Sequence, residues 1–147
     1  MFDAIKAKRV YATDINPAAI KNIRLNAAQN GLTKKIIPLR TNIFPQTKIL
    51  FDLITINPPY TDYQAADTVE KAVFDRDHKT LEYFLKNAKR FLKPNGKIMI
   101  SWANFADFKL LEKALKKYGY NFKIAGRTES LPRVYQVYEL KIKQKVR

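Results

Sequence analysis

The hydrophobic residues in the first third of the chain form short apolar runs separated by one stretch with helical spacing. The runs predict strands over residues 9–13 and 36–39. Between them, three hydrophobic side chains share one helical face: Ile20, Ile23 and Ala27. Asn16 is a favourable N-cap, Pro17 suits the first helical position, and Gly31 is placed to end the helix. The pattern therefore predicts a strand, a helix and a second strand.

The same alternation continues towards the C-terminus. Four further apolar runs predict strands over residues 51–56, 97–102, 120–124 and 134–142. Helical spacing predicts helices over residues 80–92 and 107–118, the first with Asp77 as its N-cap. Residues 93–96, Lys-Pro-Asn-Gly, read as a turn, and a polar loop separates the last two strands.

Strands that alternate with helices are typical of βαβ units. The sequence therefore predicts an α/β fold with a Rossmann-like, mostly parallel sheet in a three-layer α/β/α arrangement, and the last two strands add an antiparallel C-terminal hairpin. A chain of 147 residues is long enough for a hydrophobic core. Residues 1–147 are interpreted as one domain without repeats or an internal linker.

The tetrapeptide Asn57-Pro58-Pro59-Tyr60 follows the apolar run at residues 51–56 and carries the clearest chemical signal. The Asn57 side-chain oxygen and the Pro58 carbonyl can accept the two N–H groups of a planar amino group. The prolines fix the shape of the turn, and the Tyr60 ring can stack on a flat base or amide. The structural alternative is a strand-ending proline turn with a packed tyrosine.

Polar residues also follow the first two predicted strands. Asp14 can accept the hydroxyls of a ribose, or it can cap the helix that begins near Asn16. Asn42 can contact the edge of an adenine ring with Ile43 against the ring face, or it can serve only as a turn residue. Because the carboxyl ends of parallel strands form one crevice, Asp14, Asn42 and Asn57 are predicted to converge.

The net charge is +15, from 28 Lys and Arg against 13 Asp and Glu, which favours an anionic partner such as nucleic acid. Two basic groups stand out: Lys141, Lys143, Lys145 and Arg147 in a tail, and Lys113, Lys116 and Lys117 on a predicted helix. Residues 62–77 run the other way, with five acids against Lys71 and Arg76. That segment is therefore not predicted to bind phosphate.

Other classes of protein are disfavoured by composition. There is no cysteine, hence no disulfide framework and no thiolate zinc site. His78, the only histidine, is interpreted as a surface residue, and no metal site is predicted. No apolar run is long enough for a membrane span and no signal peptide is evident, so a cytoplasmic location is expected.

The segments Asp14-Ile15-Asn16-Pro17, Phe51-Asp52-Leu53-Ile54, Asn57-Pro58-Pro59-Tyr60 and Leu92–Gly96 resemble class I S-adenosylmethionine-dependent methyltransferases. The branch they resemble methylates exocyclic or amide nitrogens and includes small-domain RNA methyltransferases, adenine N6 enzymes and release-factor glutamine methyltransferases. The resemblance implies that S-adenosyl-L-methionine is the cofactor. It implies a target-binding role for the tetrapeptide, and it places the cofactor beside Asp14, Ile15, Asn42, Ile43 and Asn57.

The chain departs from that family at its start, because no glycine precedes Asp14 and the family opens with a strand and a Gly-rich loop. We therefore expect the first strand to be missing from the sheet, and we expect self-association or a need for an N-terminal segment. Three functions stay open. The preferred one is N-methylation of a nucleic-acid base, RNA before DNA; the others are methylation of a protein glutamine and a non-catalytic, basic nucleic-acid-binding remnant.

Overall fold

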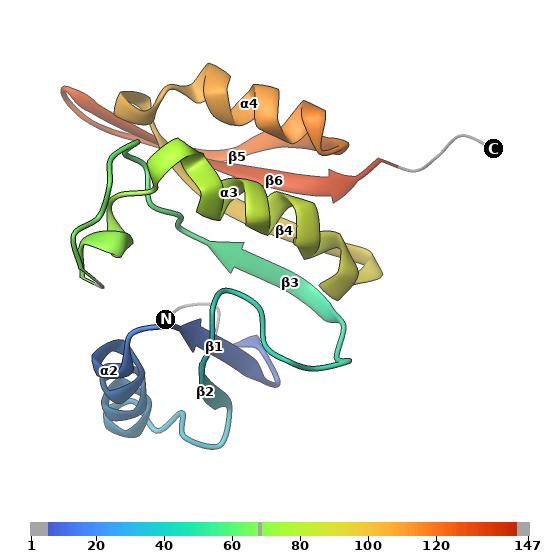
Figure 1. Ribbon diagram of the computed structural model, residues 1–147. Helices are drawn as coiled ribbons and strands as arrows, with labels where there is room; N and C mark the ends of the chain where they lie inside the picture. The colour runs from blue at the N-terminus through green and yellow to red at the C-terminus, as the bar shows by residue number, and fades with distance from the viewer. Residues whose placement is uncertain (1–5, 68, 144–147) are drawn as a thin grey trace. The chain divides into compact units, whose positions relative to one another are not determined.

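A computed structural model describes residues 6–67 and 69–143 and divides into two compact units. The first unit ends at Thr47 and the second begins at Lys48. Figure 1 labels the helices and strands of both, and each unit is described by itself.

The first unit is a strand–helix–strand motif. Strands β1 (Val10–Asp14) and β2 (Ile36–Arg40) pair in parallel, with Val10 opposite Ile36 and Asp14 opposite Arg40. Helix α2 (Pro17–Gln29) connects them. The Asn16 side chain caps the helix by accepting the Ala18 N–H at 2.9 Å. Gly31 follows the helix with a φ of +66°, a left-handed conformation that glycine adopts without strain. The predicted caps are therefore confirmed.

The first unit has a small buried core. In α2 only Ile20 and Ala27 are buried, and Leu25 is 50% exposed. The large side chains that are fully buried all belong to the second unit, and they include Trp102, Tyr120, Tyr138, Phe84 and Leu85. The hydrophobic contribution to stability, which scales with buried apolar area, is therefore concentrated in the second unit.

The second unit contains a four-stranded mixed sheet of order β3-β4-β6-β5. Its strands are β3 (Phe51–Ile56), β4 (Leu92–Ala103), β5 (Tyr120–Ser130) and β6 (Arg133–Ile142). Strands β3 and β4 are parallel, whereas β6 is antiparallel to both of its neighbours, β4 and β5. The long hairpin between β5 and β6 is the predicted C-terminal antiparallel element.

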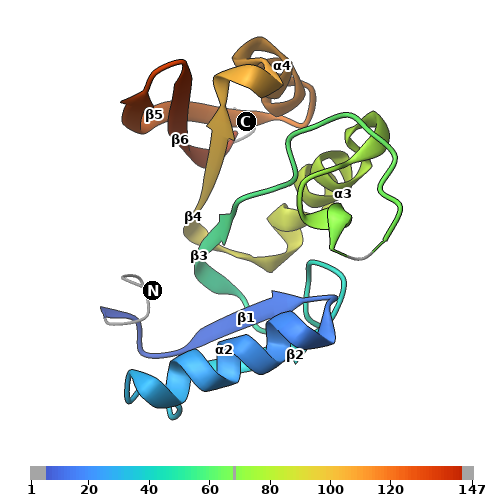
Figure 2. The same ribbon diagram turned by 90° about the vertical axis from the view of Figure 1, so that its left-hand side faces the viewer.

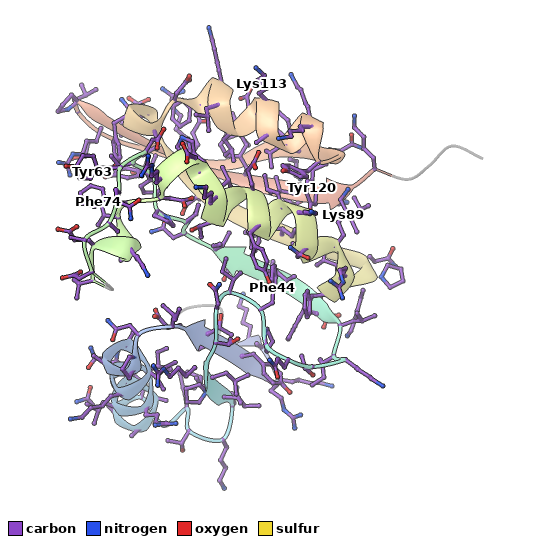
Figure 3. The ribbon with its side chains drawn as sticks, viewed as in Figure 1. Phe44, Tyr63, Phe74, Lys89, Lys113 and Tyr120 are labelled. Atoms are coloured by element: carbon purple, nitrogen blue, oxygen red, sulfur yellow. The ribbon has the colours of Figure 1, made fainter. Side chains whose placement is uncertain are left out.

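Helices α3 (Lys79–Asn87) and α4 (Phe108–Lys117) lie side by side over one face of this sheet (Figures 1 and 2). Ile98, Ile100 and Leu140 of the sheet are each fully buried, and so are Leu85 of α3 and Leu111 and Leu115 of α4. Figure 3 shows Lys89 beside Tyr120, and its ammonium lies 4.7 Å from the centre of that ring. Four 3-10 helices complete the unit: Glu70–Ala72, Arg76–His78, Ala88–Phe91 and Asn104–Ala106.

Two predicted boundaries are wrong for local reasons. Residues 93–96 are not a turn between helix and strand but an irregularity inside β4: Phe51 pairs with Leu92, and Leu53 already pairs with Lys97. Gly96 fits there because an added Cβ would lie 2.8 Å from the Phe51 carbonyl oxygen. The predicted polar loop between the last strands is largely hairpin, because polar residues near its tip pair across the strands from Gly126 to Ser130.

The α/β class, the parallel core strands and the antiparallel C-terminal hairpin are confirmed. Within the described residues, β1 pairs only with β2, and β3 pairs with β4 alone. The missing first strand and the three-layer α/β/α arrangement stay predictions. Across residues 6–67 and 69–143, no helix combines the length and apolar character that crossing a bilayer requires.

Candidate active site

The tetrapeptide that follows β3 forms a rigid, partly open turn. Asn57 is exposed, Pro58 and Pro59 are buried, and Tyr60 is half-buried. The Tyr60 ring meets the ring of Trp102 edge-on at 5.3 Å and that of Phe105 at 5.6 Å. Among the described residues no hydrogen bond to the Pro58 carbonyl oxygen is found, but Pro58 is less than 2% exposed, so its role as an acceptor for a target stays a prediction.

The Asn57 amide oxygen is the centre of a small hydrogen-bond network. It accepts a hydrogen bond from the Tyr60 hydroxyl and a second from the Ser101 hydroxyl. The two hydroxyl oxygens lie 3.3 Å apart. Sequence reasoning missed Ser101. Its signal lay in the strand register, because Ile56 pairs with Ile100 and the next residue of each strand is Asn57 and Ser101.

The segment after β4 frames the same turn. The indole N–H of Trp102 donates to the Ala106 and Asp107 carbonyl oxygens, each at 3.1 Å. These bonds fold the 3-10 helix Asn104–Ala106 back on the strand end. Phe105 is thereby held against Tyr60 while its side chain stays 56% exposed. Aromatic rings thus border the Asn57 amide.

The carboxyl end of β1 in the first unit carries Asp14. Its Oδ1 atom accepts the Asn16 N–H at 2.7 Å, so one of the two carboxylate oxygens caps the backbone before α2. No donor to the second oxygen, Oδ2, is found in the described residues. Asp14 therefore retains one acceptor for a ligand hydroxyl, which fits a ribose contact. Ile15, the next residue, is 46% exposed.

The exit of β2 lies beside that carboxylate. The Thr41 N–H donates to the Asp14 carbonyl oxygen at 3.0 Å. Ile43 has a φ of 62°, a left-handed conformation that is strained for a β-branched residue. The Thr13 hydroxyl holds it by donating to the Ile43 carbonyl oxygen at 2.7 Å. Asn42, which is exposed, precedes it.

Two groups of predicted residues are therefore each brought together within their own unit. Asp14, Ile15, Asn42 and Ile43 gather at one end of the β1–β2 pair. The residues 57–60 gather with Ser101 at the carboxyl ends of β3 and β4. Convergence of the two groups into one crevice stays a prediction.

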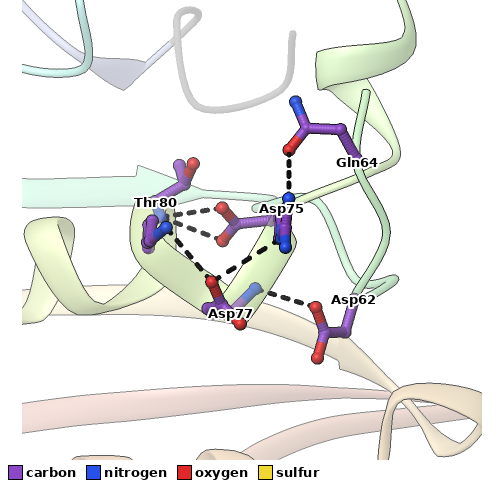
Figure 4. A network of polar contacts seen from close by, with 7 residues as sticks. Asp62, Gln64, Asp75, Asp77 and Thr80 are labelled. Carbon is purple, nitrogen blue, oxygen red and sulfur yellow. Dashed lines mark hydrogen bonds and ion pairs between the residues drawn. The ribbon is translucent and has the colours of Figure 1, made fainter. Parts of the chain in front are cut away.

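In the acidic loop, residues 61–78 without residue 68, the carboxylates bind groups of the loop itself and of the helix that follows it (Figure 4). Asp75, rather than the predicted Asp77, caps α3: its carboxylate accepts the Thr80 N–H at 2.9 Å and the Leu81 N–H at 3.2 Å. Asp62 accepts the Asp77 N–H at 2.8 Å. In Figure 3, Tyr63 lies near Phe74 on this loop, with ring centres 5.3 Å apart. The carboxylates of Asp62 and Asp75 therefore hold the loop and the start of α3 in place.

His78 is half-buried rather than a plain surface residue, and its ring centre lies 6.4 Å from that of Trp102. The Nδ1 atom of His78 is buried without a hydrogen-bond partner among the described residues. Within those residues, no group of three or more His, Cys, Asp and Glu side chains could hold a metal ion.

The resolved pKa shifts fall outside these strand ends. A hydrogen bond from Lys117 lowers the pKa of Glu82, and the same bond raises the pKa of Lys117. A hydrogen bond from Lys97 lowers the pKa of Glu139. Burial raises the pKa of Tyr138 to about 12. Lys117 is thus already paired within the predicted basic group, whose Lys113 projects from α4 in Figure 3. Lys145 and Arg147 of the predicted tail lie outside the described residues.

An acidic residue after one parallel strand and an Asn-Pro-Pro-Tyr turn after another, on an α/β fold, define a class I S-adenosylmethionine-dependent methyltransferase fold. Structural similarity supports the class. The crystal structure of a ribosomal protein L11 methylase from Lactobacillus delbrueckii subsp. bulgaricus aligns with a TM-score of 0.67 and 21% identity, covering 94% of this chain and 60% of that chain.

The chain belongs to the methyltransferase small domain family, whose model matches residues 1–129. A bifunctional methyltransferase from Rickettsia typhi is 36% identical over 124 residues, which are 76% of this chain and 24% of that protein. A Methanocaldococcus jannaschii protein, named as a protein N5-glutamine methyltransferase, is 28% identical over 127 residues, 82% of this chain and 64% of that protein. The chain thus spans about a quarter of its Rickettsia relative.

Proposed function

We propose that the protein transfers a methyl group to a planar –NH2 group, and that this group is the side-chain amide of a protein glutamine. The observation that carries the proposal is the Asn57-Pro58-Pro59-Tyr60 turn, which offers two acceptors and an aromatic ring at one strand end. A glutamine amide is preferred to a base because the acidic loop borders this turn and because the Methanocaldococcus relative bears a glutamine methyltransferase name.

The residues of the turn act on a poor nucleophile, since the lone pair of an amide nitrogen is delocalised into its carbonyl. When bound, S-adenosylmethionine supplies the methyl group from its sulfonium. The Asn57 oxygen and the Pro58 carbonyl accept the two N–H hydrogens and orient the nitrogen lone pair towards the incoming methyl carbon. The same two oxygens would stabilise the positive charge that develops on nitrogen. As the new N–CH3 bond forms, the S–CH3 bond would break to leave the neutral thioether of S-adenosylhomocysteine, and the nitrogen would lose one proton to solvent.

Cofactor binding is assigned to the strand ends of the first unit. The free oxygen of Asp14 would accept a ribose hydroxyl, and Asn42 would contact the adenine edge with Ile43 and Ile15 as apolar neighbours. The left-handed backbone at Ile43 supports this assignment, since strained residues that the surroundings hold in place cluster at ligand sites.

A second candidate target is the exocyclic amine of a nucleic-acid base, and the net charge of +15 favours it. A base offers the same amino group, and Tyr60 and Phe105 supply rings for stacking. If nucleic acid is the partner, its affinity should fall steeply between roughly 50 and 200 mM salt. A binding constant that hardly changes over that range removes this candidate.

The test is a transfer assay with methyl-labelled S-adenosylmethionine and two acceptors, a pool of glutamine-containing peptides and unmodified RNA. We expect label in peptide, and none in a peptide whose glutamine is replaced by glutamate. Asn57→Ala should lower turnover by about a hundredfold, as expected for loss of a transition-state contact. Asn121→Ala, on the exposed edge of β5, is the matched control. Label in RNA alone would contradict the glutamine assignment, and full turnover in Asn57→Ala would contradict the amino-group contact itself.

A further inference from the structure

The amide oxygen of Asn57 is already fully occupied in this structure. A carboxamide oxygen has two lone pairs, and the hydroxyls of Tyr60 and Ser101 each donate a hydrogen bond to it. A target N–H needs one of those lone pairs. If the proposed function holds, one hydroxyl must therefore leave when the target binds, while the other stays.

The Ser101 hydroxyl is carried by a residue inside the strand β4. Ser101 lies between Ile100 and Trp102, both fully buried. Its own strand position is fixed on one side by the pairing of Ser101 with Val137 of β6, and the preceding pair Ile56–Ile100 fixes the other side. A serine has one side-chain torsion between its backbone and its oxygen. Its hydroxyl therefore has little freedom to move away from Asn57.

The Tyr60 hydroxyl is carried by a longer side chain that is less constrained than that of Ser101. Tyr60 follows the end of β3, outside any strand ladder, and its ring is only half-buried. The rings that border it meet it edge-on, and one of them, Phe105, is 56% exposed. The Tyr60 hydroxyl lies on the axis of ring rotation, so turning the ring alone would not withdraw it. A change in the Cα–Cβ torsion of Tyr60 would withdraw the hydroxyl and would shift the ring against Trp102 and Phe105.

From these contacts we infer that Ser101 is a positioning residue that fixes the plane of the Asn57 amide. We also infer that the Tyr60 hydroxyl occupies the place of the target N–H until the target displaces it. The inference rests on the proposed function and deepens it. The two hydroxyls bond to the same atom, yet their removal has opposite consequences: loss of Ser101 disorders the acceptor, and loss of the Tyr60 hydroxyl frees it.

Two variants and one rescue test the kinetic consequence. Ser101→Ala is expected to lower kcat by about threefold to tenfold, the effect of one hydrogen bond, without changing the dissociation constant of the cofactor. Ser101→Thr keeps the hydroxyl on a residue suited to a strand and should restore kcat. Tyr60→Phe keeps the ring contacts and should lower KM for the target by about twofold to tenfold. Equal kcat in wild type and Ser101→Ala, or a raised KM in Tyr60→Phe, overturns the inference.

A second readout needs no turnover. The side-chain NH2 of Asn57 gives a pair of amide signals in a 15N-edited NMR spectrum, and they are assigned by their absence in Asn57→Ala. In Ser101→Ala these signals should move towards the positions of a freely rotating asparagine, and in Ser101→Thr they should stay near their wild-type positions. Signals that are unchanged in Ser101→Ala overturn the positioning role.

The two readouts separate this inference from the function on which it rests. Absence of methyl transfer to peptide and RNA refutes the proposed function, while the NMR comparison still decides whether Ser101 orders Asn57. Transfer that depends on Asn57 but not on Ser101 keeps the proposed function and rejects the inference.

Discussion

The two groups of strand-end residues are held in different ways. In the first unit the hydrogen bonds end on backbone carbonyl oxygens: the Thr13 hydroxyl donates to that of Ile43, and the Thr41 N–H donates to that of Asp14. In the second unit the hydrogen bonds join side chains only, from the hydroxyls of Tyr60 and Ser101 to the Asn57 amide oxygen. The first unit buries few residues, whereas the second has a packed core. The residues proposed to bind the cofactor thus belong to a unit with a small buried core, and those proposed to bind the target belong to a unit with a large one.

The largest expected effect is on the free energy of unfolding, and it tests the difference in buried core between the two units. Trp102→Ala should lower the free energy of unfolding by about 3–5 kcal/mol, because it empties a fully buried site. Leu25→Ala in α2 should change it by less than about 0.5 kcal/mol, because that leucine is 50% exposed. Urea titrations followed by circular dichroism measure both. A loss of similar size in the two variants would show that the first unit also depends on a buried contact at Leu25.

The next effect is on cofactor affinity, and it separates the role of Asp14 at the end of β1 from that of Asn57 at the end of β3. Asp14→Ala should weaken binding of S-adenosylhomocysteine by about tenfold to a hundredfold, since one hydrogen bond to a charged group contributes roughly 1.5–3 kcal/mol. Asn57→Ala should leave that dissociation constant within about threefold, since its main loss is in turnover. Isothermal titration calorimetry compares the two variants. The assignment of Asp14 to the cofactor fails if its variant binds as tightly as wild type.

The smallest effect concerns the surface pair that joins α3 to α4, Glu82 and Lys117, whose charged atoms lie 2.7 Å apart. Because the pKa of Glu82 is lowered, its contribution to stability exists above the unfolded pKa and is lost as the pH falls through the folded one. The raised pKa of Lys117 makes its contribution disappear as the pH rises through that value. Both groups are exposed, so the pair is weak.

The measurement is the difference in Tm between wild type and Glu82→Gln as the pH is varied. The difference should be small at neutral pH and should vanish once the pH falls below the lowered, folded-state pKa of Glu82, where the carboxyl is protonated in both states. It should also shrink in about 1 M salt. A difference that persists at low pH would mean that Glu82 contributes by packing rather than by charge.

Much of the fold could be predicted because the local signals agree with one another. The caps at Asn16 and Gly31 and the apolar run of β3 depend only on neighbouring residues, and they were predicted correctly. The irregularity at residues 93–96 could not be predicted, since it depends on how Gly96 approaches Phe51 across the strand pair. The C-terminal hairpin was predicted, but its extension from Gly126 to Ser130 was not, because polar residues in an exposed β-ribbon resemble a loop.

The site shows the same division. Asn57 and its prolines were found from a contiguous motif, whereas Ser101 comes from a distant strand and becomes visible only through the β3–β4 register. Asp77 was chosen as a helix cap on proximity, but its left-handed backbone leaves the N–H groups of Thr80 and Leu81 to Asp75. Sequence reasoning thus missed Ser101 because its contact with Asn57 spans 44 residues, and it missed Asp75 because the local backbone conformation decides which carboxylate caps the helix.

Asn104 has a consequence for loop engineering. Its side-chain amide donates to the Pro132 carbonyl oxygen at 2.9 Å and accepts the Val134 N–H at 3.0 Å, so it pairs with the hairpin as a backbone peptide would. These two bonds use only main-chain atoms of the hairpin, and the family model ends at residue 129, before the turn. We therefore expect that the turn sequence at the tip of the hairpin can be exchanged. Different turn sequences can be grafted onto it, provided that one carbonyl and the N–H two residues later still face Asn104.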